Sequence, residues 1–375
     1  MAGLYIHVPF CVKRCLYCDF YSNTDMAYKA SYLEALLKEL ELRRTYLEGE
    51  ALETIYFGGG TPSQLSAGDF EQIFEAIYRL FSVSSGAEVT IEANPDDVDR
   101  SFSQQLHQLP FSRVSMGVQS FDPEDLAFLN RRHSREQAFR AVAYCKEAGI
   151  TNLSIDLIYG LPGQTEEKWA ANIAEALRLD IPHLSAYHLI YEKNTALFKL
   201  LEAGKVKPVD EDTSVALFSL LIRLLREAGY LHYEISNFAR PGYLSRHNSS
   251  YWTGKKYLGV GPSAHSYNGK EREWNVASLP GWIEGIRSGH PALEKEPLSP
   301  DMQYNDYIIT GLRTMWGIRL DEVEQRFGAA RRNYCEKLAR PYVAQGLLRR
   351  DGERLVFSES GVFVSDGVMS DLLYV

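Results

Sequence analysis

Three cysteine side chains lie close together near the start of the chain. Cys11, Cys15 and Cys18 follow the pattern Cys-x-x-x-Cys-x-x-Cys on one short segment. Soft thiolates in such a group are the ligands that iron–sulfur clusters prefer. A four-iron cluster normally takes four cysteines, so three leave one iron open to a small molecule. The spacing therefore predicts a [4Fe-4S] cluster with one iron available to a further ligand.

Zinc is the main alternative for these thiols. Cys-x-x-Cys is a common zinc half-site, and His7 or Asp19 can supply a fourth ligand. Zinc sites usually bring a second short-spaced pair of ligands, and none follows downstream. Disulfides are disfavoured because only Cys145 and Cys335 remain, and we expect both of these in packed core positions.

The composition is that of an ordinary globular protein. The chain has 375 residues, of which 45% are hydrophobic and 24% charged, and this length favours one large and one small domain. The net charge of −9 argues against a nucleic-acid surface. No apolar run approaches the roughly 18 residues of a membrane span, which predicts at most peripheral membrane contact. Iron–sulfur thiolates need a reducing compartment, so we expect a cytoplasmic protein.

The elements that must position the cysteines alternate between strand and helix. The expected strands are Leu4–Val8, Thr54–Phe57, Glu88–Ala93, Arg113–Met116, Asn152–Leu157 and His183–His188. Near-continuous apolar strands separated by amphipathic helices predict a parallel α/β sheet. Six units are too few to close an eight-stranded barrel, so we expect an open (β/α)6 partial TIM-type barrel with its chemistry at the carboxyl ends of the strands.

The regular alternation of strands and helices ends at about residue 195. A long helix is expected from Asp210 to Ala228. From Pro300 onward, helices are expected near Met302–Met315, Leu320–Phe327 and Ala330–Gln345. The Asp351-Gly352 pair between apolar runs predicts a hairpin, which together with the three helices indicates a small C-terminal α+β winged-helix-like domain.

Four further motifs appear in order along the chain: Tyr5-Ile6-His7-Val8-Pro9-Phe10-Cys11, Gly58-Gly59-Gly60-Thr61-Pro62-Ser63, Arg113-Val114-Ser115-Met116-Gly117-Val118-Gln119-Ser120-Phe121 and Ile155-Asp156-Leu157-Ile158-Tyr159-Gly160-Leu161-Pro162-Gly163-Gln164-Thr165. With them the chain resembles the radical S-adenosylmethionine (SAM) superfamily. Within it, the chain is similar to the family of oxygen-independent coproporphyrinogen III oxidase and its haem-chaperone branch. The resemblance implies that SAM binds the open iron of the cluster.

The resemblance also implies which residues contact SAM. They are Tyr5, Gly59, Gly60, Thr61, Glu92, Gln119, Arg131 and Asp156. Their chemistry agrees, since a glycine backbone allows close approach, a carboxylate accepts from ribose hydroxyls and a guanidinium pairs with a carboxylate. For Arg131 or Asp156 taken singly, a structural salt bridge is an equally good interpretation.

Two departures separate the oxidase from the chaperone. The oxidase carries another cysteine two residues after the triplet, where this chain has Phe20. The oxidase also has a long arm before the tyrosine that corresponds to Tyr5, whereas Tyr5 is almost at the start of this sequence. Both departures resemble the chaperone branch. A third feature, the run from His247 to Trp252, looks like the chaperone's His-Asn-x-x-Tyr-Trp haem motif. The resemblance thus makes His247 the expected haem ligand, with His265 a weaker candidate, although a histidine near aromatic residues is more often simply packed.

These observations predict a haem chaperone that delivers haem to cytochrome-type respiratory acceptors. They assign no catalytic residue. A homodimer is possible. We expect a radical SAM core at 1–235, a haem-motif and connecting segment packed on the core at 236–295, and the winged-helix-like domain at 296–375. The rival is an enzyme of porphyrin biosynthesis that decarboxylates coproporphyrinogen III through a 5′-deoxyadenosyl radical. A zinc-bearing binding module would require the glycine and Gln119 motifs to be coincidences.

Overall fold

The computed structural model describes residues 2–375, and its central element is a mixed sheet of twelve strands. Six consecutive strands run parallel, each paired with the next: β1 (Ala2–Val8), β2 (Leu52–Gly59), β3 (Val83–Ala93), β4 (Arg113–Gln119), β5 (Leu153–Tyr159) and β6 (His183–His188). β1 and β6 pair with other strands and not with each other, so the barrel is open. The predicted fold class and all six predicted strands are confirmed.

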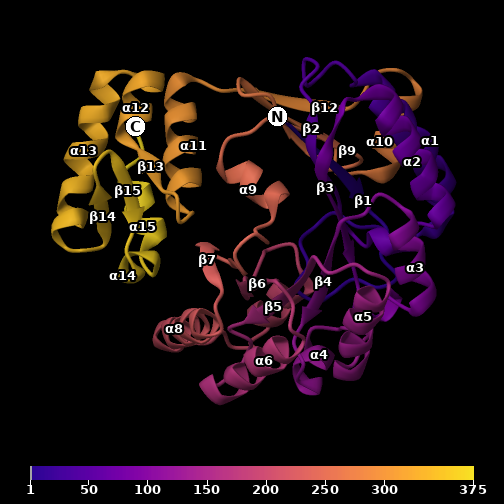
Figure 1. Ribbon diagram of the computed structural model, residues 1–375, viewed down its shortest axis with the longest axis horizontal. Helices are drawn as coiled ribbons and strands as arrows, with labels where there is room; N and C mark the ends of the chain where they lie inside the picture. Colours follow the sequence, from indigo (N-terminus) through magenta and orange to yellow (C-terminus); the bar gives the residue numbers. More distant parts are fainter. Residues whose placement is uncertain (1) are drawn as a thin grey trace.

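Helices cover the outer face of these strands (Figure 1). They are α1 (Lys29–Leu42), α2 (Ala67–Leu80), α3 (Arg100–Gln108), α4 (Pro123–Phe128), α5 (Arg135–Glu147) and α6 (Glu166–Arg178). α2 shows why they form there. Ser66 and Asp69 make a capping box at its start, and Phe70, Phe74 and Ile77 recur at helical spacing and are buried in the core.

The six strands are apolar on only one face. In β1 the outward positions include Leu4 and Ile6, which join the main hydrophobic core, whereas Tyr5 and His7 alternate with them and make polar contacts. The near-continuous apolar runs expected from the sequence hide this alternation, because aromatic rings and small residues occupy many inward positions. The concave face of the sheet is therefore polar, as a binding site requires.

The segment after β6 lengthens the sheet at both edges. It contains α7 (Ala196–Glu202), α8 (Glu211–Glu227), β7 (Leu231–Glu234), β8 (Asn237–Ala239), α9 (Arg246–Trp252), β9 (Tyr257–Val260), β10 (His265–Tyr267), β11 (Glu271–Asn275), α10 (Leu279–Arg287) and β12 (Leu293–Pro297). β9 pairs in parallel with β1, and β8 pairs antiparallel with β6. The expected boundaries near residues 235 and 295 stay predictions.

A second, smaller hydrophobic core lies in the C-terminal part, on the left of Figure 1. Its elements are α11 (Pro300–Leu312), β13 (Ile318–Arg319), α12 (Leu320–Phe327), α13 (Ala329–Ala344), β14 (Leu348–Asp351), β15 (Arg354–Phe357), α14 (Glu359–Val362) and α15 (Ser365–Asp371). The helices and the hairpin have the predicted winged-helix-like arrangement. None of the helices within residues 2–375 has the length and apolar character to cross a membrane.

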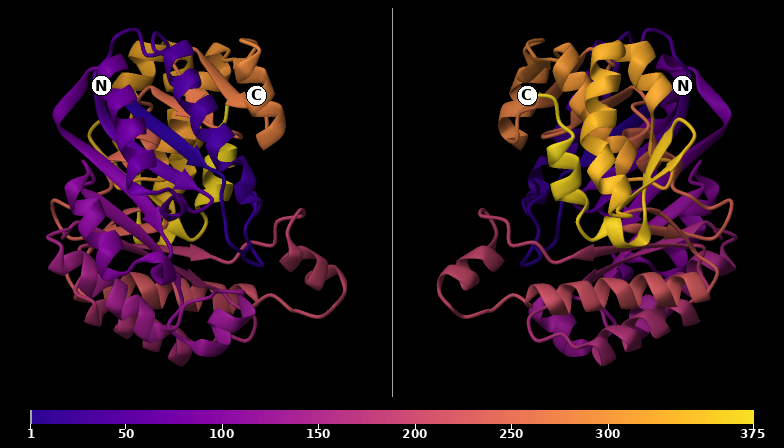
Figure 2. Two further views of the ribbon diagram at one scale, coloured as in Figure 1. Left: turned by 90° about the vertical axis from the view of Figure 1, so that its right-hand side faces the viewer. Right: turned by 90° about the vertical axis from the view of Figure 1, so that its left-hand side faces the viewer.

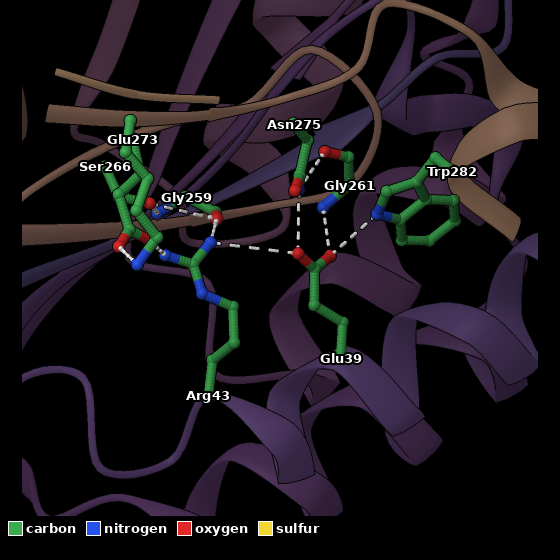
Figure 3. Close-up of polar contacts among 9 residues, drawn as sticks. Glu39, Arg43, Gly259, Gly261, Ser266, Glu273, Asn275 and Trp282 are labelled. Atoms are coloured by element: carbon green, nitrogen blue, oxygen red, sulfur yellow. Dashed lines mark hydrogen bonds and ion pairs between the residues drawn. The ribbon is translucent and has the colours of Figure 1, made fainter. Parts of the chain in front are cut away.

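The added strands are fastened to α1 by buried charge (Figure 3). The Glu39 carboxylate accepts hydrogen bonds from Gly261 N at 2.8 Å, Asn275 Nδ2 at 2.7 Å and Trp282 Nε1 at 3.0 Å. One turn later, Arg43 pairs with Glu273 at 2.6 Å. These contacts cross more than two hundred residues of sequence, and they hold β9 to β11 against the first helix.

Candidate functional site

The cysteine loop leaves the carboxyl end of β1 and is fixed on both sides. Cys11 N donates to Asn23 O at 3.0 Å, and Asn23 N donates back to Pro9 O at 2.6 Å. On the other side, Leu16 N donates to Leu129 O at 3.3 Å. The base of the loop is thus closed by Asn23, and its middle rests against Leu129, a distant part of the chain.

The thiols have polar neighbours. Cys11 Sγ lies 3.4 Å from Thr61 Oγ1, and Arg131 Nη1 donates to Cys15 Sγ at 3.2 Å. Burial raises the pKa of the Cys11 thiol, and it raises the pKa of Cys18 to about 11. The thiols of Cys11 and Cys18 are therefore protonated at neutral pH without metal, so metal binding must release protons.

The arrangement of the thiols bears on the choice between zinc and a cluster. Within residues 2–375, no three cysteine, histidine or carboxylate side chains gather around a single metal-ion position. A zinc ion with Zn–S bonds of about 2.3 Å would need its thiolates within about 4 Å of one another. A [4Fe-4S] cluster instead takes each thiolate on a different iron. All three thiols are free and lie on one loop, so each is available to a different iron of such a cluster.

The glycine run at the end of β2 packs directly on the beginning of the cysteine loop. Gly60 N donates to Val8 O at 2.8 Å, and a Cβ on Gly60 would come within 2.8 Å of Phe10 O. Gly59 has φ of +106°, which favours glycine, and its N–H donates to Glu92 Oε2 at 3.1 Å. Side chains at these positions would push the run away from the loop.

Two carboxyl groups face the same space. Tyr56 donates to Glu92 Oε1 at 2.7 Å, and Ser115 donates to Asp156 Oδ1 at 3.5 Å. Burial raises the pKa of Glu92 to about 7 and the pKa of Asp156 to about 6. Both groups change charge close to neutral pH, and when ionised they can accept hydrogen bonds from hydroxyl or ammonium groups.

Gln119 and Arg131 complete this end of the sheet. Gln119 is buried with φ of +68°, a strained value for a residue with a side chain, and it follows a break in the register between β4 and β5. Arg131 Nη2 donates to Asn94 Oδ1 at 2.7 Å and to Gly117 O, while its Nε has no partner within residues 2–375. Arg131 therefore links the cysteine loop to the ends of β3 and β4.

The structure thus brings the residues expected to contact SAM to one region. Tyr5 stacks on Tyr56 with ring centroids 6.1 Å apart, and its hydroxyl lies 3.1 Å from His7 Nδ1. Tyr56 and Asn94 were not among the expected residues, although Tyr56 lies three positions before Gly59 and Asn94 two positions after Glu92. Accepting carboxylates, a glycine backbone and a guanidinium with an unpaired N–H fit the amino acid and ribose portions of SAM.

The expected haem ligand His247 lies inside the barrel at the opposite end of the strands. It is 1% exposed, with Nδ1 at 2.8 Å from Thr54 Oγ1 and Nε2 at 2.8 Å from the Tyr251 hydroxyl. Its ring stacks on Tyr56 at 4.8 Å. Burial, with a smaller contribution from the charge of Arg113, lowers the pKa of His247 to about 3. The imidazole is neutral, and both of its nitrogens are engaged.

Trp252, the last residue of the motif, faces the C-terminal part. Trp252 lies under the Arg313 guanidinium at 5.0 Å, and Arg313 Nη2 donates to the buried Glu234 at 3.2 Å. α9 therefore connects the barrel interior with the C-terminal part. The second candidate, His265, is exposed on β10 and stacks on Trp274 at 5.7 Å, and no hydrogen bond from residues 2–375 occupies its ring nitrogens.

Comparisons with known proteins agree with this geometry. The profile of the radical SAM superfamily matches residues 5–176, and that of the HemN C-terminal domain matches residues 298–364. Haem chaperone HemW from Mycobacterium tuberculosis is 36% identical over 99% of this chain and 94% of its own length. Haem chaperone HemW from Bacillus subtilis is 30% identical over 100% of this chain and 99% of its own.

The structural comparison points the same way. The coproporphyrinogen III oxidase HemN from Escherichia coli, described as a radical SAM enzyme, superposes with a TM-score of 0.86 at 25% identity, covering 99% of this chain and 89% of that one. The open parallel barrel, the cysteine loop at its carboxyl end and the full-length likeness lead to one assignment. The chain belongs to the radical SAM superfamily and, within it, to the family of haem chaperone HemW.

Proposed function

We propose that this protein is a cytoplasmic haem chaperone that binds haem and passes it to haem-dependent respiratory proteins, and that it carries a [4Fe-4S] cluster and SAM. The observation that carries the proposal is the likeness to HemW over the whole chain, including the haem motif on α9. The exposed Phe20 on the cysteine loop supports it, because a phenyl ring can neither ligate metal nor transfer electrons.

Cys11, Cys15 and Cys18 would hold the cluster, and SAM would take the open iron. When bound, the cluster supplies an electron-rich iron site beside the SAM sulfonium. The protein's own part is to orient the ligand. Gly59 and Gly60 expose backbone, Glu92 and Asp156 accept hydrogen bonds, and Arg131 offers a guanidinium to the ligand's carboxylate.

His247 would bind the haem iron through Nε2, and the present hydrogen bond to Tyr251 must then be broken. The depressed pKa of His247 favours ligation, since a neutral imidazole can bind iron without first losing a proton. Nδ1 beside Thr54 would keep the ring orientation fixed, as the second nitrogen of a ligating histidine usually does. Haem binding through His247 therefore includes a movement of α9 or of the Tyr251 side chain.

The test is a haem titration of wild type, His247→Ala and His265→Ala, followed by absorption in the Soret region. A matched control is His290→Ala, which removes an exposed histidine far along the sequence from both candidates. We expect His247→Ala to change the ligation spectrum and weaken binding, while His290→Ala behaves as wild type. If only His265→Ala changes the spectrum, haem binds on the exposed edge strand β10 instead.

The second candidate function is coproporphyrinogen III oxidation, which the superposition on HemN favours. Two assays separate the candidates. Transfer of haem from the loaded protein to an apo-cytochrome supports the chaperone, whereas repeated conversion of coproporphyrinogen III to vinyl products, with reductant and SAM supplied, supports the oxidase. Retention of haem without transfer to any acceptor would contradict the chaperone proposal.

A further inference from the structure

A cationic side chain without a partner lies in the middle of the barrel. Arg113, the first residue of β4, is 1% exposed. Its Nε and Nη1 atoms have no hydrogen-bond partner, and no carboxylate within residues 2–375 forms an ion pair with it. Burying a charge is expensive unless other groups compensate it, so the charges around Arg113 must account for its position.

The sheet register places two carboxyl groups on the same face as Arg113. Side chains two residues apart on a strand share a face, so Arg113, Ser115 and Gly117 all point inward. Glu92 is the register partner of Ser115, and Asp156 is the register partner of Gly117. Both carboxyl groups therefore lie beyond Arg113 toward the carboxyl end of the sheet. The Ser115 hydrogen bond draws Asp156 back toward it.

The other ionisable groups facing this space do not replace the charge of Arg113. A third buried carboxylate, Glu88, shares a face of β3 with Glu92, but it accepts hydrogen bonds from the backbone N–H groups of Arg246 and His247. His183 and His247 each have both nitrogens engaged by hydroxyl groups, and burial lowers both pKa values, so they are neutral. Tyrosines from β1, β2, β7 and α9 remain protonated because burial raises their pKa values: Tyr5, Tyr56, Tyr233 and Tyr251. Tyr187 on β6 is 42% exposed. Arg131 already bonds Asn94, Gly117 O and Cys15.

We propose that Arg113 is a positioning residue for the SAM pocket, and that its buried guanidinium is the fixed counter-charge that keeps Glu92 and Asp156 available as hydrogen-bond acceptors for the ligand. The proposal rests on the SAM site proposed above. Arg113 acts from the middle of the barrel and does not touch the ligand. In this arrangement the positive charge of Arg113 acts on Glu92 and Asp156 together. Neither carboxylate forms a direct ion pair with it, which accounts for its unpaired N–H groups.

The direction of the pH effect follows from the carboxyl groups. Burial raises the pKa of Glu92 to about 7 and of Asp156 to about 6, whereas the charge of Arg113 lowers both. Removing that charge moves both values upward, so more of each group is neutral at pH 7. A neutral carboxyl loses acceptor capacity toward hydroxyl and ammonium groups. SAM binding should therefore weaken at pH 7 and recover as the pH rises.

The first experiment measures SAM binding by equilibrium dialysis to the anaerobically reconstituted protein between about pH 6 and pH 8.5. We expect Arg113→Met to bind SAM several-fold more weakly than wild type at pH 7 and to approach wild type at the alkaline end. Arg113→Lys retains the charge and should bind within about three-fold of wild type at every pH. Equal, pH-independent losses in both variants would overturn the proposal.

A second experiment tests the counter-charge without SAM. Its result therefore does not depend on whether the protein binds SAM at the proposed site. Denaturation midpoints of wild type, Arg113→Met, Glu92→Gln and the double variant are compared at a pH above both carboxyl pKa values. If Arg113 neutralises Glu92, Glu92→Gln should raise the midpoint of Arg113→Met by more than it raises the midpoint of wild type. A matched control is Arg135→Met, whose guanidinium pairs with Glu175 at 2.6 Å and in which Glu92→Gln should have no larger effect than in wild type. Equal effects of Glu92→Gln in all backgrounds would refute the counter-charge.

Discussion

Arg43→Met offers a quantitative test of the buried network that joins α1 to the added strands. Arg43 is 7% exposed, and its guanidinium contacts Glu273 Oε2 at 2.6 Å, Gly259 O at 3.1 Å and Glu39 Oε1 at 3.8 Å. Removing it leaves two buried carboxylates without their shared cation, and the loss of one partner from a buried pair costs about 3–5 kcal/mol. Lys295 also reaches Glu273, at 2.5 Å, but it is mostly exposed and can contribute at most about 1 kcal/mol.

The assay is urea unfolding followed by tryptophan fluorescence, because Trp282 donates to Glu39 within the same network. With a urea dependence of about 3 kcal/mol per molar, the expected loss lowers the midpoint by about 1 to 1.7 M. The loss should shrink at lower pH, because burial raises the pKa of Glu39, and the carboxyl group becomes neutral as the pH falls through that raised value. A neutral Glu39 no longer needs the missing cation.

Arg44→Met is the matched control. The adjacent Arg44 pairs with Glu41 at 2.7 Å, but the two side chains are 54% and 47% exposed, so its loss should cost at most about 1 kcal/mol. The reasoning also predicts that Arg43→Met with Glu273→Met is more stable than Arg43→Met alone, since one unpaired charge has been removed. If Arg43→Met shifts the midpoint no further than Arg44→Met, the network does not carry the stability assigned to it.

Three further outcomes are expected. Replacing the three loop cysteines with serine should reduce iron in anaerobically prepared protein from about four per chain to background, and stoichiometric zinc in the wild type would contradict the cluster. Neither wild type nor Phe20→Cys should convert coproporphyrinogen III, as liquid chromatography of the porphyrin products will show; accumulating vinyl products would place the chain among the oxidases. Since burial raises the pKa of Glu92 from 4.5 to about 7, the ligand-free protein should lose stability as the pH rises through that interval, and Glu92→Gln should remove this part of the pH dependence, which thermal unfolding at several pH values measures.

The sequence predicted the barrel well because its signals are local. Each parallel strand is a short apolar run between helical stretches. Gly58 to Gly60 lie at the end of β2, and the cysteines follow β1. The predicted winged-helix-like part rested on equally local signals, such as the Asp351-Gly352 turn. In each case a few adjacent residues determine the conformation, so no knowledge of distant contacts is needed.

The added strands and the surroundings of His247 depend on distant contacts. β10 has three residues and β9 four, too short for a recognisable alternation, and β9 is held in place by pairing with β1. His247 was expected from its motif, but its burial depends on Thr54, which lies 193 residues earlier in the chain. The unpartnered state of Arg113 likewise depends on where β3 and β5 place their carboxyl groups.

The cysteine loop has a wall that is synthesised late. Leu197 N in α7 donates to Leu16 O at 3.0 Å, and Leu197 belongs to a small apolar cluster against which Leu16 and Tyr17 pack. Figure 2 shows the segment that carries α7 projecting from the body of the molecule. Because this wall follows the loop by about 180 residues, a ribosome adding about 5–20 residues per second delivers it about 10 to 35 s later. During that interval the side of the nascent cysteine loop formed by Leu16 and Tyr17 lacks the apolar surface that covers it in the folded protein.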